Sequence, residues 1–337
     1  MSTKRRPFLF EALEDRSLLS VGSELVSNIN ETIGGDSSTP EDFAVIGNIM
    51  YFAADGEYGR ELWKTNGTAE GTSLVKDIVP GLQGSNPTNL ANINGTLYFA
   101  ADDGVHGVEL WMSDGTSEGT VLVKDINLGP EGSSPDQLTN VNGTAYFIAE
   151  GNGRGRELWR SRGPNDTTMV KDIEPGPEDS TAYELTAMNN TLFFTAEHTV
   201  RGRELWRSNG TGSSTKIVRD INLGGEGSYP KGLTKVNGIL YFSADDGVAE
   251  RLYKSDGTSR GTKPVSADVF EPEHIANVNG TIYFNGQTRE FGKELWKSDG
   301  TEEGTVLVKD IVVGTSWSSP RHLTNVNGTL FFVAFDA

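Results

Sequence analysis

Four arginines and two histidines are the side chains of this 337-residue chain whose placement favours ligand binding. They are Arg154, Arg156, Arg201, Arg203, His106 and His198. The guanidinium group presents paired N–H donors that fit a carboxylate, so the arginine cluster predicts a site for an anion or an acidic sugar. Charge balance with the glutamates that flank these arginines is the alternative interpretation.

Tryptophan is the second residue type that could contact a ligand. Five tryptophans recur in a column at Trp63, Trp111, Trp159, Trp206 and Trp296. They would form either a ring of sugar-stacking aromatics or a set of wedges between neighbouring sheets. We prefer the wedges, because one buried aromatic per repeat removes about 150–250 Å² from water. Trp317 lies outside the column and is expected to be an exposed ligand contact.

Aspartates in repeated turns are the only candidate metal ligands. Asp114, Asp256 and Asp299 begin Asp-Gly-Thr turns, and Asn66 and Asn209 occupy the same position in other copies. Oxygen ligands of this kind suit calcium, which is the one cofactor the sequence suggests. Aspartate also bonds its own backbone two residues on, and this turn-stabilising role is the interpretation we prefer. The aspartate of a repeated Lys-Asp-Ile motif is likewise expected to accept hydrogen bonds from loop amides.

Little in the chain points to catalysis. Cysteine is absent, which excludes disulfides, thiolate catalysis and Cys-ligated zinc. The four histidines have neither triad nor metal-ligand spacing around them, and most carboxylates belong to repeated columns. A hydrolase or lyase acting on glycans remains an alternative, and it needs two unrepeated carboxylates that converge at a central pocket.

The composition excludes two classes of partner. Lys and Arg number 29 against 47 Asp and Glu, so the formal net charge is −18. Nucleic acid and anionic lipid surfaces both require a basic face, so neither is expected as a partner. No apolar run approaches the ~18 residues of a spanning helix, so no membrane insertion is expected.

An internal repeat determines the expected fold. The motif Glu-Leu-Trp, with Arg-Leu-Tyr in one copy, places an aromatic residue at 63, 111, 159, 206, 253 and 296. An Asn-Gly pair also recurs, and this dipeptide suits the type I′ turn of a β-hairpin. In the second repeat we expect strands at 90–93, 96–101, 108–112 and 121–126. Four short strands per 40–50 residues are typical of a β-propeller blade, whereas a parallel β-helix has shorter coils.

The chain ends bear on closure of the ring. Residues 25–30 resemble a fourth strand, and residues 322–336 supply a first and a second strand. We therefore expect an all-β propeller of seven blades, with six full repeats and a three-stranded closing blade built from both ends. A shortened relative of a longer array is the alternative. The connection at 269–274 is shorter than its equivalents, which predicts a notch between the fifth and sixth repeats.

The repeats resemble the bacterial ELWxxDGT family. The motif is complete from Glu294 to Thr301, and the Asn-Gly hairpin is similar to that of kelch-type propellers. The resemblance implies an exported, surface-associated protein and no catalytic residues. Residues 10–20 also resemble the LEPR-XLL element of exported proteins, and Arg5 and Arg6 resemble the start of a twin-arginine signal.

These observations predict two parts of the chain: an export-associated or disordered segment at 1–22 and a propeller at 23–337. The preferred function is a non-catalytic, monomeric binding module at the cell surface or outside the cell, with a protein or polysaccharide partner. The variable connections on one face of a ring are the expected binding surface. A calcium-stabilised structural repeat is the remaining alternative.

Overall fold

The computed structural model describes residues 26–29 and 37–336, and all the regular structure in this part of the chain is β-strand. We refer to each successive group of four strands as a unit, so that unit 1 is β1–β4 and unit 6 is β21–β24. Units 1 to 4 are separate four-stranded antiparallel sheets, units 5 and 6 share one sheet, and β25 and β26 form a terminal pair. The predicted all-β class is confirmed. No helix long and apolar enough to cross a membrane occurs in the described residues.

The strands of the first three units are similar in length. Unit 1 contains β1 (Glu41–Ile46), β2 (Ile49–Gly56), β3 (Gly59–Thr65) and β4 (Ser73–Lys76). Unit 2 contains β5 (Thr88–Ile93), β6 (Thr96–Asp102), β7 (Val108–Ser113) and β8 (Val121–Lys124). Unit 3 contains β9 (Asp136–Val141), β10 (Thr144–Glu150), β11 (Arg156–Ser161) and β12 (Thr167–Lys171).

The later units repeat this plan with two irregular strands, β20 and β21. Unit 4 contains β13 (Tyr183–Met188), β14 (Thr191–Ala196), β15 (Glu204–Ser208) and β16 (Lys216–Arg219). Unit 5 contains β17 (Lys231–Val236), β18 (Ile239–Asp245), β19 (Glu250–Ser255) and β20 (Lys263–Pro264). Unit 6 contains β21 (Phe270–Val278), β22 (Thr281–Gln287), β23 (Glu294–Ser298) and β24 (Val306–Lys309), and the terminal pair is β25 (Arg321–Val326) and β26 (Thr329–Val333).

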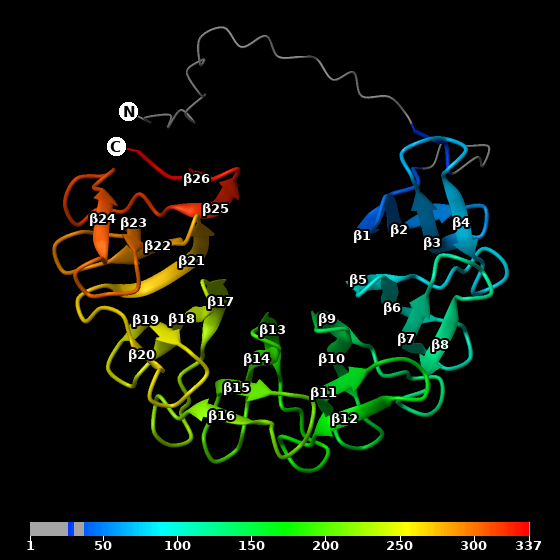
Figure 1. The fold of residues 1–337 in the computed structure, drawn as a ribbon, viewed down its shortest axis with the longest axis horizontal. Coiled ribbons are helices and arrows are strands. Elements are labelled where there is room, and N and C mark those ends of the chain that lie inside the picture. Colours follow the sequence, from blue (N-terminus) through cyan, green and yellow to red (C-terminus); the bar gives the residue numbers. More distant parts are fainter. Residues whose placement is uncertain (1–25, 30–36, 337) are drawn as a thin grey trace, which may run out of the picture.

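The sheets are arranged radially around a central opening (Figure 1). The first strand of each unit lies at the opening and contacts the first strand of the next unit, while the fourth strand lies at the rim. This is a propeller-like arrangement, as the repeat predicts. A gap separates unit 1 from the terminal pair (Figure 1), so the ring of described residues is open.

The hairpins follow from the Asn-Gly turns. Asn94 and Gly95 have φ of 56° and 92°, and a type I′ turn requires positive φ at both central residues. The strand that follows buries residues on both faces, since the neighbouring residues Tyr98 and Phe99, which point to opposite faces, are 4% and 0% exposed. The strands predicted for the second repeat agree with those observed to within two residues at each end.

The core lies between neighbouring units rather than within one sheet. Each apolar cluster joins a valine on the fourth strand of one unit, or directly after it in unit 5, to the aromatic residue on the third strand of the next. The pairs are Val75 with Trp111, Val123 with Trp159, Val170 with Trp206, Val218 with Tyr253, and Val265 with Trp296. The four tryptophans in these pairs are only 3–7% exposed, so the prediction that the column forms wedges between sheets is confirmed.

The predicted closing blade is not confirmed. β25 and β26 pair only with each other among the described strands, and residues 26–29 form no strand. The rest of the segment that resembles a fourth strand lies outside the described residues, as do the predicted export-associated segment and its boundary at residues 22 and 23.

The predicted notch between units 5 and 6 is wrong. The short connection at 269–274 is taken up by a long strand, β21, whose first residue Phe270 pairs with Arg251 of β19. The Arg251 guanidinium lies 5.1 Å from the centre of the Phe270 ring. A shorter connection therefore draws the two units into one sheet instead of separating them.

Candidate functional site

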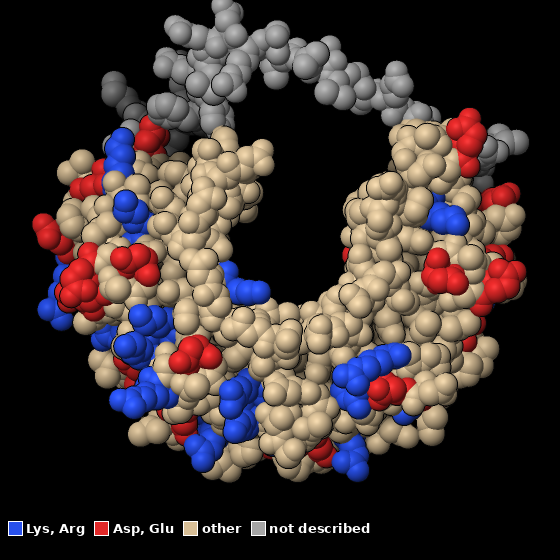
Figure 2. Space-filling view, viewed as in Figure 1, with Lys and Arg blue, Asp and Glu red and all other residues tan. Residues whose placement is uncertain are grey.

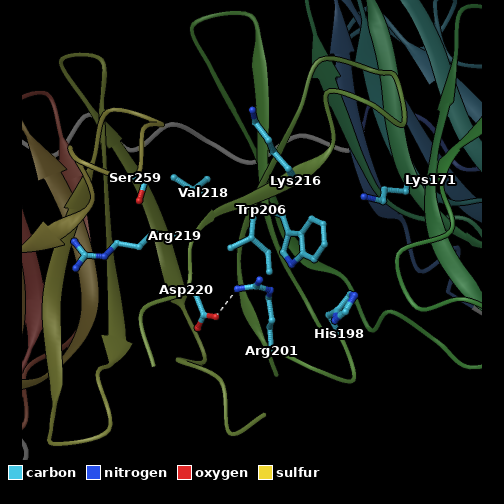
Figure 3. A pocket seen from close by; sticks show the side chains of 10 residues that line it. Lys171, His198, Arg201, Trp206, Lys216, Val218, Arg219, Asp220 and Ser259 are labelled. Carbon is cyan, nitrogen blue, oxygen red and sulfur yellow. Dashed lines mark hydrogen bonds and ion pairs between the residues drawn. The ribbon is translucent and has the colours of Figure 1, made fainter. Parts of the chain in front are cut away.

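An open groove on the rim of unit 4 contains two of the predicted ligand-binding residues, His198 and Arg201. We call it the rim groove; its volume is about 420 Å³. Its basic side chains are Lys171, His198, Arg201, Lys216 and Arg219, and its one carboxylate is Asp220. Figure 3 shows these side chains around Trp206. They come from the fourth strands of units 3 and 4 and from the β14–β15 connection.

Hydrogen bonds hold most of these basic groups in place. Arg201 Nη1 lies 2.7 Å from Asp220 Oδ2. Lys171 Nζ donates to the Thr215 carbonyl at 3.0 Å and lies 5.4 Å from the centre of the Trp206 ring. Because Trp206 is 3% exposed, its ring supports these groups and has little area left for stacking on a sugar.

The basic groove stands out against the charge of the whole chain. Residues 150–260 carry 15 Lys and Arg against 16 Asp and Glu, so almost all of the net −18 lies elsewhere. On the face shown in Figure 2, most of the Lys and Arg lie over the lower half of the ring, where units 3 to 5 are found. This sector is the part of the molecule best suited to an anion.

The four predicted arginines do not form one cluster. Arg201 lines the rim groove, and its counterpart Arg154 pairs with Asp172 at 3.0 Å on unit 3. Arg156 donates to the Ser134 carbonyl at 3.0 Å. Its counterpart Arg203 donates to a main-chain carbonyl in the same way and also lies over the Tyr183 ring. Arg156 and Arg203 therefore brace the start of the innermost strand, and Arg154 and Arg201 are the more exposed pair.

The remaining predicted residues lie on different units. His198 lines the rim groove, with its ring 6.2 Å from that of Trp206. His106 belongs to unit 2, and its hydrogen bond to Asp103 (Nδ1 to Oδ2, 2.7 Å) raises the pKa of the imidazole above its usual value. Trp317 is 61% exposed, as expected, and lies in the connection that follows unit 6. The structure therefore unites only His198 and Arg201 in one site.

A column of buried glutamates was missed by the sequence analysis. The glutamate of every Glu-Leu-Trp motif is fully buried, and most of them accept a hydrogen bond from a serine 24 residues further on. Examples are Ser228 Oγ to Glu204 at 2.6 Å and Ser318 Oγ to Glu294 at 2.5 Å. The 24-residue spacing from glutamate to serine recurs in four units, and this signal in the sequence could have revealed the hydrogen bonds that hold the connection between units.

The Asp-Gly-Thr turns use their aspartates internally. Asp114 Oδ1 accepts hydrogen bonds from the Thr116 amide at 2.9 Å and hydroxyl at 2.7 Å, and the hydroxyl bond lowers the pKa of Asp114. The carboxylate lies so close to Gly119 that a Cβ there would meet Asp114 Oδ1 at 2.1 Å, which explains the glycine five residues after this aspartate. Across the described residues, no three His, Asp or Glu side chains are grouped as metal ligands.

Substitution of Asp114 distinguishes a role of this aspartate in stabilising the turn from a role in binding calcium. Asp114→Ala should lower the thermal midpoint, because the turn loses its two hydrogen bonds from Thr116, whereas Asp114→Asn should be nearly neutral, because asparagine makes the same turn. Thermal melting with and without a chelator should give the same midpoint for the parent chain. A midpoint that falls with chelator, and a loss of that response in Asp114→Asn, would instead support bound calcium.

The Lys-Asp-Ile aspartates only partly match the prediction. Asp310 accepts from the Gly314 amide at 3.1 Å, as expected of this column. Asp172 and Asp220 instead pair with arginines, and one oxygen of each is buried without a hydrogen-bond partner in the described part of the chain. The lysine of the same motif has the clearer role, since Lys76, Lys124 and Lys171 each donate to a carbonyl of the next unit.

A second groove lies at the central opening. Its volume is about 450 Å³, and it is lined by the innermost strands β9, β13 and β17. Glu184 is the one carboxylate among its lining residues, and it accepts hydrogen bonds from the amides of Gly232 and Leu233 at 2.9 and 2.8 Å. The pair of carboxylates that a glycoside hydrolase needs is therefore not found among the residues that line this groove.

Comparisons with known proteins bear on the fold alone. The chain matches no protein-family model and no curated protein. Among solved structures it is similar to a mutant of puromycin hydrolase complexed with PGG, with 15% identity, a TM-score of 0.49, and coverage of 88% of this chain and 50% of that one. It is also similar to a prolyl endopeptidase, with 10% identity, a TM-score of 0.50, and coverage of 88% and 46%. The chain thus spans about half the length of these structures.

A third structure has a more similar length. It is the β-propeller domain of the Trilobed protease from Pyrococcus furiosus, described as having an open velcro topology, with 14% identity and a TM-score of 0.40 over 80% of this chain and 84% of that one. At such low identities these comparisons extend to the architecture and to none of the enzymes' activities. The chain has a propeller-like, all-β fold.

Proposed function

We propose that this chain is a non-catalytic binding module that takes an anionic polymer, an acidic polysaccharide or an acidic protein segment, in the rim groove. The observation that carries the proposal is the gathering of five basic side chains around a single carboxylate in an open groove. Attraction between such a cluster and a polyanion is long-ranged and speeds association. Because the groove is open on the rim, it suits a chain that lies across it more than a small molecule that must be enclosed.

Two further features belong to this proposal. The resemblance to ELWxxDGT repeats and the LEPR-XLL-like segment support a place at the cell surface or outside the cell. The register of the repeats supports a ring of seven blades whose last blade uses both ends of the chain. A monomer presenting its rim to an extended partner fits both features.

Reversal of the charge at Lys216 tests the groove. Lys216 is exposed and contributes no ion pair within the described residues, so Lys216→Glu should leave stability unchanged. We expect binding to polygalacturonate at low salt to weaken by about tenfold, and more salt should weaken binding by the parent chain. A poly-glutamate peptide assayed in parallel distinguishes a polysaccharide from a protein partner.

The matched control is Lys263→Glu. Lys263 occupies the same strand position in unit 5, is also exposed, and does not line the groove. It should bind as the parent does. Equal losses in the two variants would mean that net charge alone attracts the polymer, and an absence of binding to both probes would contradict the proposal.

A further inference from the structure

Large apolar side chains project into solvent from the connections on one face of the ring. The loops between second and third strands and the connections from a fourth strand to the next unit leave their sheets at the same end, because neighbouring strands are antiparallel. The eight most exposed large apolar side chains of the described residues all belong to these connections and are 61–84% exposed: Leu82, Val105, Leu128, Val200, Leu223, Val248, Val313 and Trp317. Exposed apolar groups gathered on one face are typical of a docking surface.

On units 1 and 2 four of these connections form one continuous surface. They comprise residues 57–58, 77–87, 103–107 and 125–135. A Cβ at Gly59 would meet the Leu82 carbonyl oxygen at 2.6 Å, and a Cβ at Gly104 would meet Val79 Cγ1 at 4.0 Å, so the second connection touches the loops on both sides of it. A Cβ at Gly107 would likewise meet a carbonyl oxygen of the last connection at 2.5 Å. We call this surface the unit 1–2 face; its exposed apolar side chains are Tyr58, Leu82, Val105 and Leu128.

The charge of the unit 1–2 face is negative throughout. The six connections from a fourth strand to the next unit contain 11 Asp and Glu and no Lys or Arg. The two loops of the unit 1–2 face likewise contain no Lys or Arg. The carboxylates of this face are Glu57, Asp77, Asp103, Asp125 and Glu131. A partner that covers the apolar side chains must therefore also be positively charged.

One aspartate of this face lacks the cation that its counterpart has. On unit 4, Asp220 Oδ2 lies 2.7 Å from Arg201 Nη1. On unit 2 the place of that arginine, three residues before the glutamate of the Glu-Leu-Trp motif, is taken by His106, which pairs with Asp103 instead. Asp125, the counterpart of Asp220, forms no ion pair in the described part of the chain, and its Oδ1 is buried without a hydrogen-bond partner there. A guanidinium or ammonium group from another molecule can take the place of the missing arginine.

We propose that the unit 1–2 face binds a basic amphipathic segment of another protein, whose apolar side chains cover Leu82, Val105 and Leu128 and whose Arg or Lys pairs with Asp125. Burial of apolar surface supplies affinity, and opposite charge directs the segment to this face. A second copy of the chain would bring one acidic face against another, and an anionic lipid surface would be repelled in the same way. The proposal goes beyond the rim groove, which lies on other units and is basic.

Calorimetric titration of the full chain with a designed peptide tests this proposal. The probe is a peptide of two Leu-Lys-Lys-Leu-Leu-Lys-Leu repeats, which is basic on one side of a helix and apolar on the other. We expect micromolar binding at physiological salt, where a Debye length of about 8 Å screens most of the general attraction by net charge. The heat capacity change should be negative, because apolar surface is buried. A peptide with serine in place of every leucine keeps the charge and should bind about tenfold more weakly or less.

Paired substitutions locate the binding site on the ring. Leu82→Ser with Leu128→Ser should weaken binding of the leucine peptide by about tenfold, because two apolar contacts are lost. The matched control is Leu223→Ser with Val313→Ser, which changes equally exposed residues of the same kind of connection on units 4 and 6. The control should bind as the parent does. All four side chains are exposed, so the thermal midpoint should stay unchanged in both variants.

A third variant tests the pairing with Asp125. His106→Arg supplies on unit 2 the guanidinium that Arg201 supplies on unit 4, so it should neutralise Asp125 within the chain and weaken binding of the leucine peptide by about threefold. His106→Gln removes the same imidazole without supplying a cation and should leave the affinity unchanged. An unchanged affinity in His106→Arg, or equal losses in the two variants, would overturn the role of Asp125.

The remaining outcomes decide the proposal as a whole. No binding of the leucine peptide, equal binding of the serine peptide, or equal losses in the two paired variants would overturn it. A parent chain that dimerises in sedimentation experiments, and loses its dimer in Leu82→Ser with Leu128→Ser, would assign the face to a second copy. Binding of polygalacturonate should be the same in all these variants, so failure here is distinct from failure of the polyanion proposal.

Discussion

Replacement of Trp111 by alanine is expected to lower the free energy of unfolding by about 4 kcal/mol. Trp111 is 6% exposed and belongs to a cluster with Val75 and Ile78 of the preceding unit. Removal of the indole leaves a cavity between two units that rigid sheets cannot close. Denaturant unfolding followed by circular dichroism measures the loss, and hydrogen exchange shows whether opening begins at the boundary between units 1 and 2.

Trp63 provides the matched control within the same column. It is only half-buried, because no complete unit precedes unit 1 in the described residues. Trp63→Ala should therefore cost about half as much, near 2 kcal/mol. Equal losses at Trp63 and Trp111 would contradict the role of the tryptophans as wedges between units. They would indicate instead that each ring packs mainly within its own sheet.

The free energy of unfolding is expected to fall as the pH rises from about 4.5 to about 7. Burial raises the pKa of Glu157 and of Glu204 to about 7, against an ordinary value of 4.5. Nearby Asp172 and Asp220 add to the rise. The folded chain therefore holds two protons that the unfolded chain releases. Their stabilising contribution is complete below pH 4.5 and is lost as the pH passes through 7.

The size of this effect follows from the two shifts. A shift of one pKa unit corresponds to about 1.4 kcal/mol, so each glutamate contributes about 3 kcal/mol between the two limits. Below pH 4 the trend should reverse, because the turn aspartates have lowered pKa values and lose hydrogen bonds when protonated. Urea unfolding measured at intervals from pH 3 to pH 8 should show a maximum in the free energy of unfolding at about pH 4 to 4.5.

The double variant Glu157→Gln and Glu204→Gln isolates these two groups. Its stability should depend far less on pH between 4.5 and 7 than that of the parent, although it is less stable at pH 5. Burial also raises the pKa values of Glu61 and Glu109, and a hydrogen bond to Asp103 raises that of the His106 imidazole; these groups titrate alike in both proteins and so cancel in the comparison. A double variant with an unchanged slope would mean that the two glutamates titrate near their ordinary values.

Several features of the fold were predictable because they depend on local chemistry. Asn94 and Gly95 form the expected hairpin, since positive φ is a property of those residues. The buried tryptophans were predictable from spacing, because a bulky apolar residue at one position of every repeat needs a repeated cavity. The notch at 269–274 was predicted wrongly, because loop length fixes how far apart two strands can lie but not the direction in which a shorter loop moves them.

The repeat, the strand order within each unit and the inward placement of the aromatic column follow from the sequence, since these features depend on period, turn residues and hydrophobicity. Which charged groups meet depends instead on how neighbouring units pack. Arg154 and Arg201 look equivalent in the sequence, yet Arg201 shares its groove with Lys216 and Arg219. Contacts at the rim depend on which side chains the two neighbouring units bring to each boundary. The repeat in the sequence does not show which of these side chains come into contact.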